Sequence, residues 1–382
     1  MVVSEQRIPE LNGLRGIAVL MVLAWHFMGA IISPDLGLLY EIISNVFVFG
    51  RTGVDLFFVL SGFLIIGILV DRRDGPAYFV PFYFRRAARI LPPYLLLVTL
   101  FWIFTLSLSP NVYFGKTIKL WEYLVFGQNW FMSYHNEWGP GASSVTWSVA
   151  IEEQFYLIIP LVIFFTPSNR LKTVLIWFAV ASAAARAIFH FIDPENNLAP
   201  YVNTLFRLDG LCVGGLLALA YRNSSLLAKF RENRQLIAKA FVVCSALIPF
   251  FVGFFRAWPS DTMYYWGHCY LVVFYAIGLL TILLYQGSIS LRFLRNSALQ
   301  FAGLISYSLY LFHPMIIGLF FLARGRVEKL ATIQDAGLLM AAFATTVAFC
   351  WISYHAMEKR LIAWGRRVRY SSSATPLIAA NS

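Results

Sequence analysis

The strongest constraint on this chain is a series of apolar segments, each close to the roughly 20 residues that an α-helix needs to cross a bilayer. Ten such segments cover residues 12–33, 53–70, 90–108, 147–166, 171–190, 205–222, 236–256, 264–286, 299–323 and 336–362. Hydrophobic residues make up 59% of the 382 residues and charged residues only 13%, whereas a soluble domain carries about 25% charge. The sequence therefore predicts an all-α polytopic membrane bundle with about ten transmembrane helices.

Lysine and arginine gather in alternate loops between these segments. If the N-terminus lies inside, the inner loops contain most of them, including Arg72, Arg73, Arg222, Lys229, Arg360 and Arg366. The positive-inside rule then predicts that both termini are cytoplasmic. This distribution explains the formal net charge of +11 as a topology signal, so we expect the bilayer and no nucleic acid as a partner. The four cysteines lack metal-ligand spacing, and no metal is expected.

The domain organisation predicted from the sequence is simple. Residues 1–370 form one membrane domain, and residues 371–382 are small and polar and are expected to be a disordered tail. The segment 109–146 is rich in aromatic residues and glycine, and we expect it to cover a cavity from outside. The sequence leaves the oligomeric state open, with a homodimer among the alternatives.

Ionisable residues inside predicted spans are costly, and by default they suggest a functional site. This chain has many: Arg15, His26, Asp55, Glu152, Glu153, Arg186, Arg207, Asp209, His313 and His355. The alternative for each is pairing between helices. Arg15 and His26 are 11 positions apart, which corresponds to about 16 Å along a helix and about 20° around it. They therefore project from one face of the first helix, an anion-binding group near one end and a proton-transfer group further along.

Two later helices carry polar stripes at helical spacing. One consists of Ser148, Glu152 and Tyr156, and the other of Ser306, Tyr310 and His313. Glu152 is expected at the depth of His26, in one buried polar layer with His313 and an Arg207–Asp209 pair. Nearer the cytoplasm, Arg85, Arg86 and Arg89 precede Pro92 and Pro93. They suit phosphate groups of a nucleotide-like ligand, although such clusters also serve topology and anionic lipids.

Seven sequence stretches, in order over nearly the whole chain, resemble motifs of the acyltransferase-3 family of integral membrane acyl-CoA-dependent O-acyltransferases. They are IPELNGLRGIAVLMVLAWHF (8–27), GVDLFFVLSGFLI (53–65), FRRAARILPPY (84–94), WSVAIEEQFYLIIP (147–160), FRLDGLCVGGLLA (206–218), SYSLYLFHP (306–314) and YHAMEKRL (354–361). The resemblance implies transfer of an acyl group, usually acetyl, from acyl-CoA to a sugar hydroxyl. The acceptor would be an exported polysaccharide, a glycolipid or a glycosylated metabolite. The protein would be located in the bacterial cytoplasmic membrane.

By position, the resemblance makes Arg15 and His26 the essential pair. The supporting site taken from the resemblance and from the polar stripes comprises Asp55, Ser61, Trp147, Ser148, Glu152, Glu153, Tyr156, Arg207, Asp209, Tyr310 and His313. As a hypothesis, Arg15 and the arginines at 85, 86 and 89 hold the phosphates of acetyl-CoA. His26 is a general base or a transient acyl carrier, and Glu152 orients its imidazole. Tyr310, Ser148 or His313 donates to the developing oxyanion.

Two alternatives from other classes use the same residues. A proton-coupled secondary transporter also needs intramembrane histidine and carboxylate groups, although the chain shows none of the internal repeats that such proteins often have. A non-catalytic scaffold or sensor would tolerate alanine at the buried charges. The order of the family motifs favours the acyltransferase.

Overall fold

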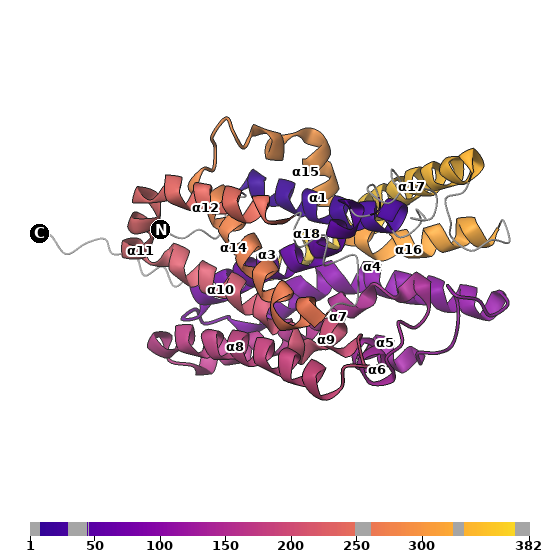
Figure 1. The fold of residues 1–382 in the computed structure, drawn as a ribbon, viewed down its shortest axis with the longest axis horizontal. Coiled ribbons are helices and arrows are strands. Elements are labelled where there is room, and N and C mark those ends of the chain that lie inside the picture. Colours follow the sequence, from indigo (N-terminus) through magenta and orange to yellow (C-terminus); the bar gives the residue numbers. More distant parts are fainter. Residues whose placement is uncertain (1–7, 30–43, 45, 249–260, 324–331, 371–382) are drawn as a thin grey trace, which may run out of the picture.

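The computed structural model describes residues 8–29, 44, 46–248, 261–323 and 332–370, and every regular element among them is helical. The prediction of an all-α fold is confirmed for this part of the chain. Figure 1 shows the helices running mostly along the long axis of the molecule, with α11 and α12 toward one end and the short helices α5 and α6 displaced toward the other.

Seven stretches of the described chain are long and apolar enough to cross a membrane, and two bent helix pairs raise the number to nine. The elements that form them are α1 (Pro9–Ala24) with the π-helical turn η1 (Trp25–Gly29), η3 (Phe49–Thr52) with α3 (Gly53–Arg72), α4 (Phe79–Ser107), η4 (Gly141–Ser143) with α7 (Thr146–Phe165), α8 (Ser168–Ile192), η6 (Met263–Gly267) with α14 (His268–Leu284), and α17 (Ile333–Ser353) with η8 (Tyr354–Glu358) and α18 (Lys359–Gly365). The bent pairs are α10 (Leu208–Arg222) with α11 (Ser224–Glu232), at 93°, and α15 (Ser297–Leu304) with α16 (Ser306–Leu322), at 74°.

Shorter elements complete the described chain. They are α5 (Leu120–Leu124), α6 (Gln128–His135), α9 (Ala199–Val202), η5 (Thr204–Phe206), α12 (Arg234–Ala246) and η7 (Arg292–Arg295). Helix α12 forms the first part of the predicted span 236–256, and residues 249–256 of that span lie outside the described residues. The predicted tail, 371–382, lies outside them as well.

Two predicted helices differ from the observed ones. Helix α4 begins at Phe79 and contains Pro92 and Pro93, so the prediction that it starts near residue 90, behind a basic loop, was wrong. Membrane helices tolerate proline because neighbouring groups compensate the lost hydrogen bonds. The predicted span 299–323 is bent at Ile305, which separates α15 from α16.

Helix α3 lies at the centre of the bundle and packs against α1, α7, α10 and α14. It is apolar around most of its circumference, as expected for a helix buried on all sides. Its approach to α10 depends on two glycines, because a Cβ on Gly62 would lie 1.9 Å from the Leu211 carbonyl oxygen and one on Gly214 would lie 2.0 Å from that of Val59. Small residues allow such backbone contact between membrane helices.

The close contact between α3 and α10 predicts that Gly214→Ala destabilises the protein. The added methyl group collides with backbone, so the helices must separate, and overpacking of this kind costs about 1–3 kcal/mol. We expect a lower midpoint for thermal unfolding in detergent. Gly337→Ala on α17 is the matched control, since a Cβ there meets nothing within 4 Å. Equal unfolding midpoints for the two variants would contradict the observed packing.

Candidate active site

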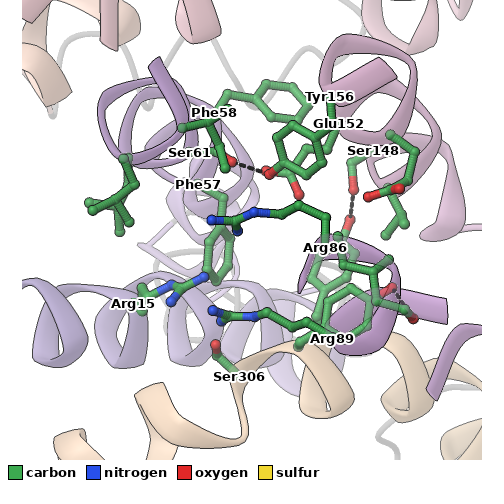
Figure 2. Close-up of a pocket in the computed structure, with 18 of the residues that line it drawn as sticks. Arg15, Phe57, Phe58, Ser61, Arg86, Arg89, Ser148, Glu152, Tyr156 and Ser306 are labelled. Atoms are coloured by element: carbon green, nitrogen blue, oxygen red, sulfur yellow. Dashed lines mark hydrogen bonds between the residues drawn. The ribbon is translucent and has the colours of Figure 1, made fainter. Parts of the chain in front are cut away.

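A cavity lies inside the bundle between α1, α3, α4, α7 and α16, with about 800 Å³ of empty space that includes open solvent. We call it the arginine cavity. Its polar lining consists of Arg15, Ser61, Arg86, Arg89, Ser148, Glu152, Glu153, Tyr156, Ser306, Tyr307 and Tyr310. Figure 2 shows the side chains of Arg15, Arg86 and Arg89 pointing into the same space, above Ser306 and beside Phe57. Residues from five separate segments of the sequence thus meet in one site.

The three guanidinium groups of this cavity repel one another. Within the described residues, none of them has an ion-pair or hydrogen-bond partner; Arg86 has only the rings of Phe82 and Tyr156 at 5.9 Å. Three cations that share the electrostatic influence of Glu152, with no direct ion pair among the described residues, are costly inside a membrane protein. An anionic ligand with several negative charges would neutralise them, and phosphate groups match the geometry of arginine.

Arg85 does not belong to this cluster. Its Nε donates to the Val368 carbonyl at 3.1 Å, and its guanidinium lies over the ring of Tyr370 at 4.7 Å. The prediction grouped Arg85 with Arg89 because they are one helical turn apart. The structure instead places Arg86 and Arg89 in the cavity and uses Arg85 to hold the segment that follows α18.

The carboxylates of α7 face the same cavity. Glu152 lies within the electrostatic reach of Arg15, Arg86 and Arg89 and contacts the hydroxyl of Ser61, which is hydrogen-bonded to the hydroxyl of Tyr156. One oxygen of Glu153, Oε1, is buried and has no hydrogen-bond partner among the described residues. The predicted polar stripe of Ser148, Glu152 and Tyr156 is confirmed as a single lining surface.

His26 lies in a second cavity of about 750 Å³, which we call the histidine cavity. Its lining comprises Val22, Trp25, His26, Arg51, Val54, Trp138, Ser144, Val145, Trp147, Tyr201 and Tyr310. Three of these residues, Trp138, Ser144 and Val145, come from the segment 109–146, as expected for a segment that covers a cavity. Burial raises the pKa of Tyr201 to about 12, so its phenol is a neutral donor at physiological pH.

The orientation of His26 is fixed by the π-helical turn that ends the first span. Its Nδ1 lies 2.9 Å from the Val22 carbonyl oxygen, and because a carbonyl only accepts, Nδ1 carries the proton and Nε2 is the basic nitrogen. The ring of His313 lies edge-on to that of His26, with centroids 4.6 Å apart. Nδ1 of His313 is bonded in the same way to the Leu309 carbonyl at 3.0 Å, and its Nε2 is buried with no partner in the described chain.

The expectation that Glu152 orients the imidazole of His26 was wrong. Glu152 lines the arginine cavity, whereas His26 lines the other one and has the Val22 carbonyl at Nδ1. The two residues had been placed at one depth by counting helical turns, which does not show which cavity a side chain enters. The structure pairs His26 with His313 instead.

The two cavities meet at Val54 on α3 and Tyr310 on α16, which line both of them. We call this meeting point the junction. The hydroxyl of Tyr310 donates to the Val145 carbonyl at 3.0 Å and lies 2.6 Å from the Ser148 hydroxyl. Because the Tyr310 proton goes to the Val145 carbonyl, Ser148 donates to Tyr310, and both hydroxyl protons are used in contacts within the protein.

A network of buried ion pairs lies beside the histidine cavity. Arg207 donates to Asp55 at 2.6 Å and lies 2.9 Å from His268 Nδ1. Asp209 is paired with Arg186 at 2.8 Å rather than with Arg207, which corrects the predicted pair. The Arg207 guanidinium also lies behind the rings of Tyr201 (5.2 Å) and Trp147 (6.0 Å), which line the histidine cavity. Asp55, Arg207 and Asp209 thus support the wall of the site from outside it.

Several residues of the histidine cavity were missed from the sequence. Trp25, Arg51, Trp138 and Tyr201 all line it, and the guanidinium of Arg51 lies 3.8 Å from the ring centre of Trp25. Trp138 and Tyr201 lie outside the motifs, Tyr201 in the short helix α9, and only the aromatic content of segment 109–146 pointed to one of them. No group of three or more histidine, cysteine or acidic side chains suited to a metal occurs among the residues that the structure describes.

The fold and these internal cavities define the class: a polytopic α-helical membrane protein with a buried polar site. A family model described as "Acyltransferase domain" matches residues 8–355. The chain therefore belongs to the acyltransferase-3 family, as the sequence motifs predicted.

Named relatives agree with this assignment. The chain is 29% identical, over 82% of its length, to the O-acetyltransferase OatA of Staphylococcus aureus strain NCTC 8325 / PS 47, and equally to that of strain MRSA252. A protein of Staphylococcus aureus strain COL, 25% identical over 92% of the chain, also carries the term O-acetyltransferase in its name. The chain spans 51% of the first relatives and 56% of the last, about half of their lengths. No solved structure matches at a significant level.

Proposed function

We propose that this protein is a membrane O-acyltransferase that moves an acyl group, most simply acetyl, from cytoplasmic acyl-CoA to a hydroxyl of a sugar-containing acceptor. The observation that carries the proposal is the pairing of two cavities. Three arginines without partners line one, a histidine with a basic Nε2 lines the other, and the cavities meet at the junction.

The donor fits the arginine cavity by charge. Coenzyme A carries phosphates at its nucleotide end, which Arg15, Arg86 and Arg89 would hold. Glu152 faces the same three guanidinium groups, so we now assign it to donor positioning. The thioester would lie at the junction, because Arg15 and His26 are separated by about 16 Å along the helix, a span that the flexible pantetheine arm can follow.

The acceptor fits the histidine cavity. The acceptor hydroxyl would give its proton to His26 Nε2 as its oxygen attacks the thioester carbonyl carbon. The Ser148 hydroxyl, turned away from Tyr310, would donate to the oxyanion and stabilise it. Collapse of the intermediate breaks the carbon–sulfur bond, and the coenzyme leaves as a thiol after taking the proton from His26. Aromatic walls formed by Trp25, Trp138 and Trp147 suit the apolar face of a sugar ring.

The proposed orientation has both termini in the cytoplasm, supported by the bias of lysine and arginine between alternate loops. The arginine cavity then faces the compartment that makes acyl-CoA, and the histidine cavity lies toward the outside, where an exported glycan or glycolipid is available. The Staphylococcus relatives support a bacterial cytoplasmic membrane.

The test is release of free thiol from acetyl-CoA by purified protein in detergent, in the presence and absence of oligosaccharide acceptors. We expect thiol release to rise with acceptor and acetylated sugar to appear in equal amount. A proton-coupled transporter, the alternative use of the same histidines and carboxylates, would release no thiol. It would instead accumulate solute in proteoliposomes under a pH gradient.

A further inference from the structure

The junction between the two cavities is formed by a small number of buried side chains. Val54 and Tyr310 are each only 6% exposed, and among the described residues they are the two that line both cavities. A group that reaches from a ligand among the arginines to a partner beside His26 at this point would contact both of them. On the proposed function, that group is the acyl part of the donor.

Val54 is held rigidly on its helix. It lies at the start of α3, the central helix, which is locked to α10 by the glycine contacts at Gly62 and Gly214. A β-branched side chain such as valine also has few rotamers within a helix. Val54 therefore presents a fixed methyl surface to the junction.

Tyr310 is equally constrained. Its hydroxyl is bonded to the Val145 carbonyl and the Ser148 hydroxyl at the start of α7. Its ring lies edge-on to Phe57 on one side (6.3 Å between centroids) and to His313 on the other (6.1 Å). A ring held by four neighbours does not swing aside for a larger ligand without breaking these contacts.

We propose that Val54 and Tyr310 form the acyl-binding subsite and that the side chain of Val54 limits the length of the acyl group that is transferred. The inference rests on the proposed function. The methyl groups of Val54 would lie against the acyl chain next to the thioester carbonyl, whose oxygen would face Ser148. Each added methylene would then crowd Val54, and hydrophobic pockets discriminate one methylene by about 10- to 200-fold.

The test measures kcat/KM for acetyl-CoA, propionyl-CoA and butyryl-CoA on the same preparation of each variant. The result is given as the ratio of kcat/KM for the longer donor to kcat/KM for acetyl-CoA. We expect Val54→Ala to raise the propionyl-to-acetyl ratio by about tenfold or more. Val54→Leu should lower the propionyl-to-acetyl ratio below the wild-type value, and it should also slow acetyl transfer. Because each ratio comes from one preparation, a partly unfolded variant changes both of its terms alike.

Val59→Ala is the matched control. It makes the same change on the same helix, at a fully buried position that lines neither cavity, and its ratio should stay within twofold of the wild-type value. The proposal is overturned if Val54→Ala leaves the ratio unchanged or if Val59→Ala shifts it as much. A wild-type protein that transfers no acyl group from any acyl-CoA would instead refute the proposed function itself.

Discussion

Replacement of His26 by alanine is expected to reduce acyl transfer by about 10²- to 10⁴-fold, the range that a general base contributes. The reason is geometric. The Val22 carbonyl fixes the proton on Nδ1, so Nε2 is the atom that would accept the proton of the acceptor hydroxyl. No other imidazole of the described residues lines the same cavity, and the Arg51 guanidinium is already protonated. The measurement is kcat/KM for thiol release with acceptor present, together with the unfolding midpoint in detergent.

His355 provides the matched control for this substitution. Its Nδ1 is bonded to the Trp351 carbonyl at 2.9 Å, four positions earlier in a π-helical turn, just as in His26, but its side chain is exposed. His355→Ala should therefore keep near wild-type activity. If His26→Ala kept full transfer, or if both variants lost it equally, His26 would not be the base.

The second large effect is expected for Arg15. Arg15→Gln removes one of three cations that have no protein partner, and it should raise the KM for acetyl-CoA by about 10- to 100-fold, since a hydrogen bond to a charged group contributes roughly 1.5–3 kcal/mol. The value of kcat should change less, because this contact is made equally in the ground and transition states. Removal of the Arg15 charge also relieves the repulsion that it exerts on Arg86 and Arg89, so the fold should not suffer.

Two substitutions make the Arg15 result specific. Arg15→Lys keeps the charge but loses the planar fork, so we expect an intermediate KM. Arg170→Gln removes a charge from an exposed position outside both cavities, and it should leave the KM unchanged. A KM for Arg15→Gln equal to that of the wild type would show that the donor phosphates bind elsewhere.

Much of the fold could be predicted from the sequence because the bilayer leaves few solutions for apolar segments of this length. The helices α3, α7 and α8 begin and end within a few residues of the predicted bounds. The bend at Ile305 and the passage of α4 through Pro92 and Pro93 could not be predicted, since both depend on how neighbouring helices satisfy the backbone. The number of spans in the described chain is seven, or up to nine if each of the bent pairs α10–α11 and α15–α16 counts as one span.

The sequence predicted which residues line the candidate site better than it predicted which of them are neighbours. The shared face of Arg15 and His26 follows from helical geometry alone, and both residues line the connected cavities. The position of Glu152 does not follow in this way, because depth along one helix says nothing about which neighbours surround it. The pairing of Arg207 with Asp55 rather than with nearby Asp209 is likewise a property of tertiary contacts between distant segments.

The junction has a consequence for the cell as well as for the reaction. A continuous water-filled path through a membrane protein would short-circuit the ion gradients that drive much of cellular energetics, and narrow apolar constrictions prevent this by excluding water. Val54 and the ring of Tyr310 are buried and line both cavities. On the proposed function, we expect them to act as such a constriction, so that the acyl group crosses between the cavities while ions stay on their own side.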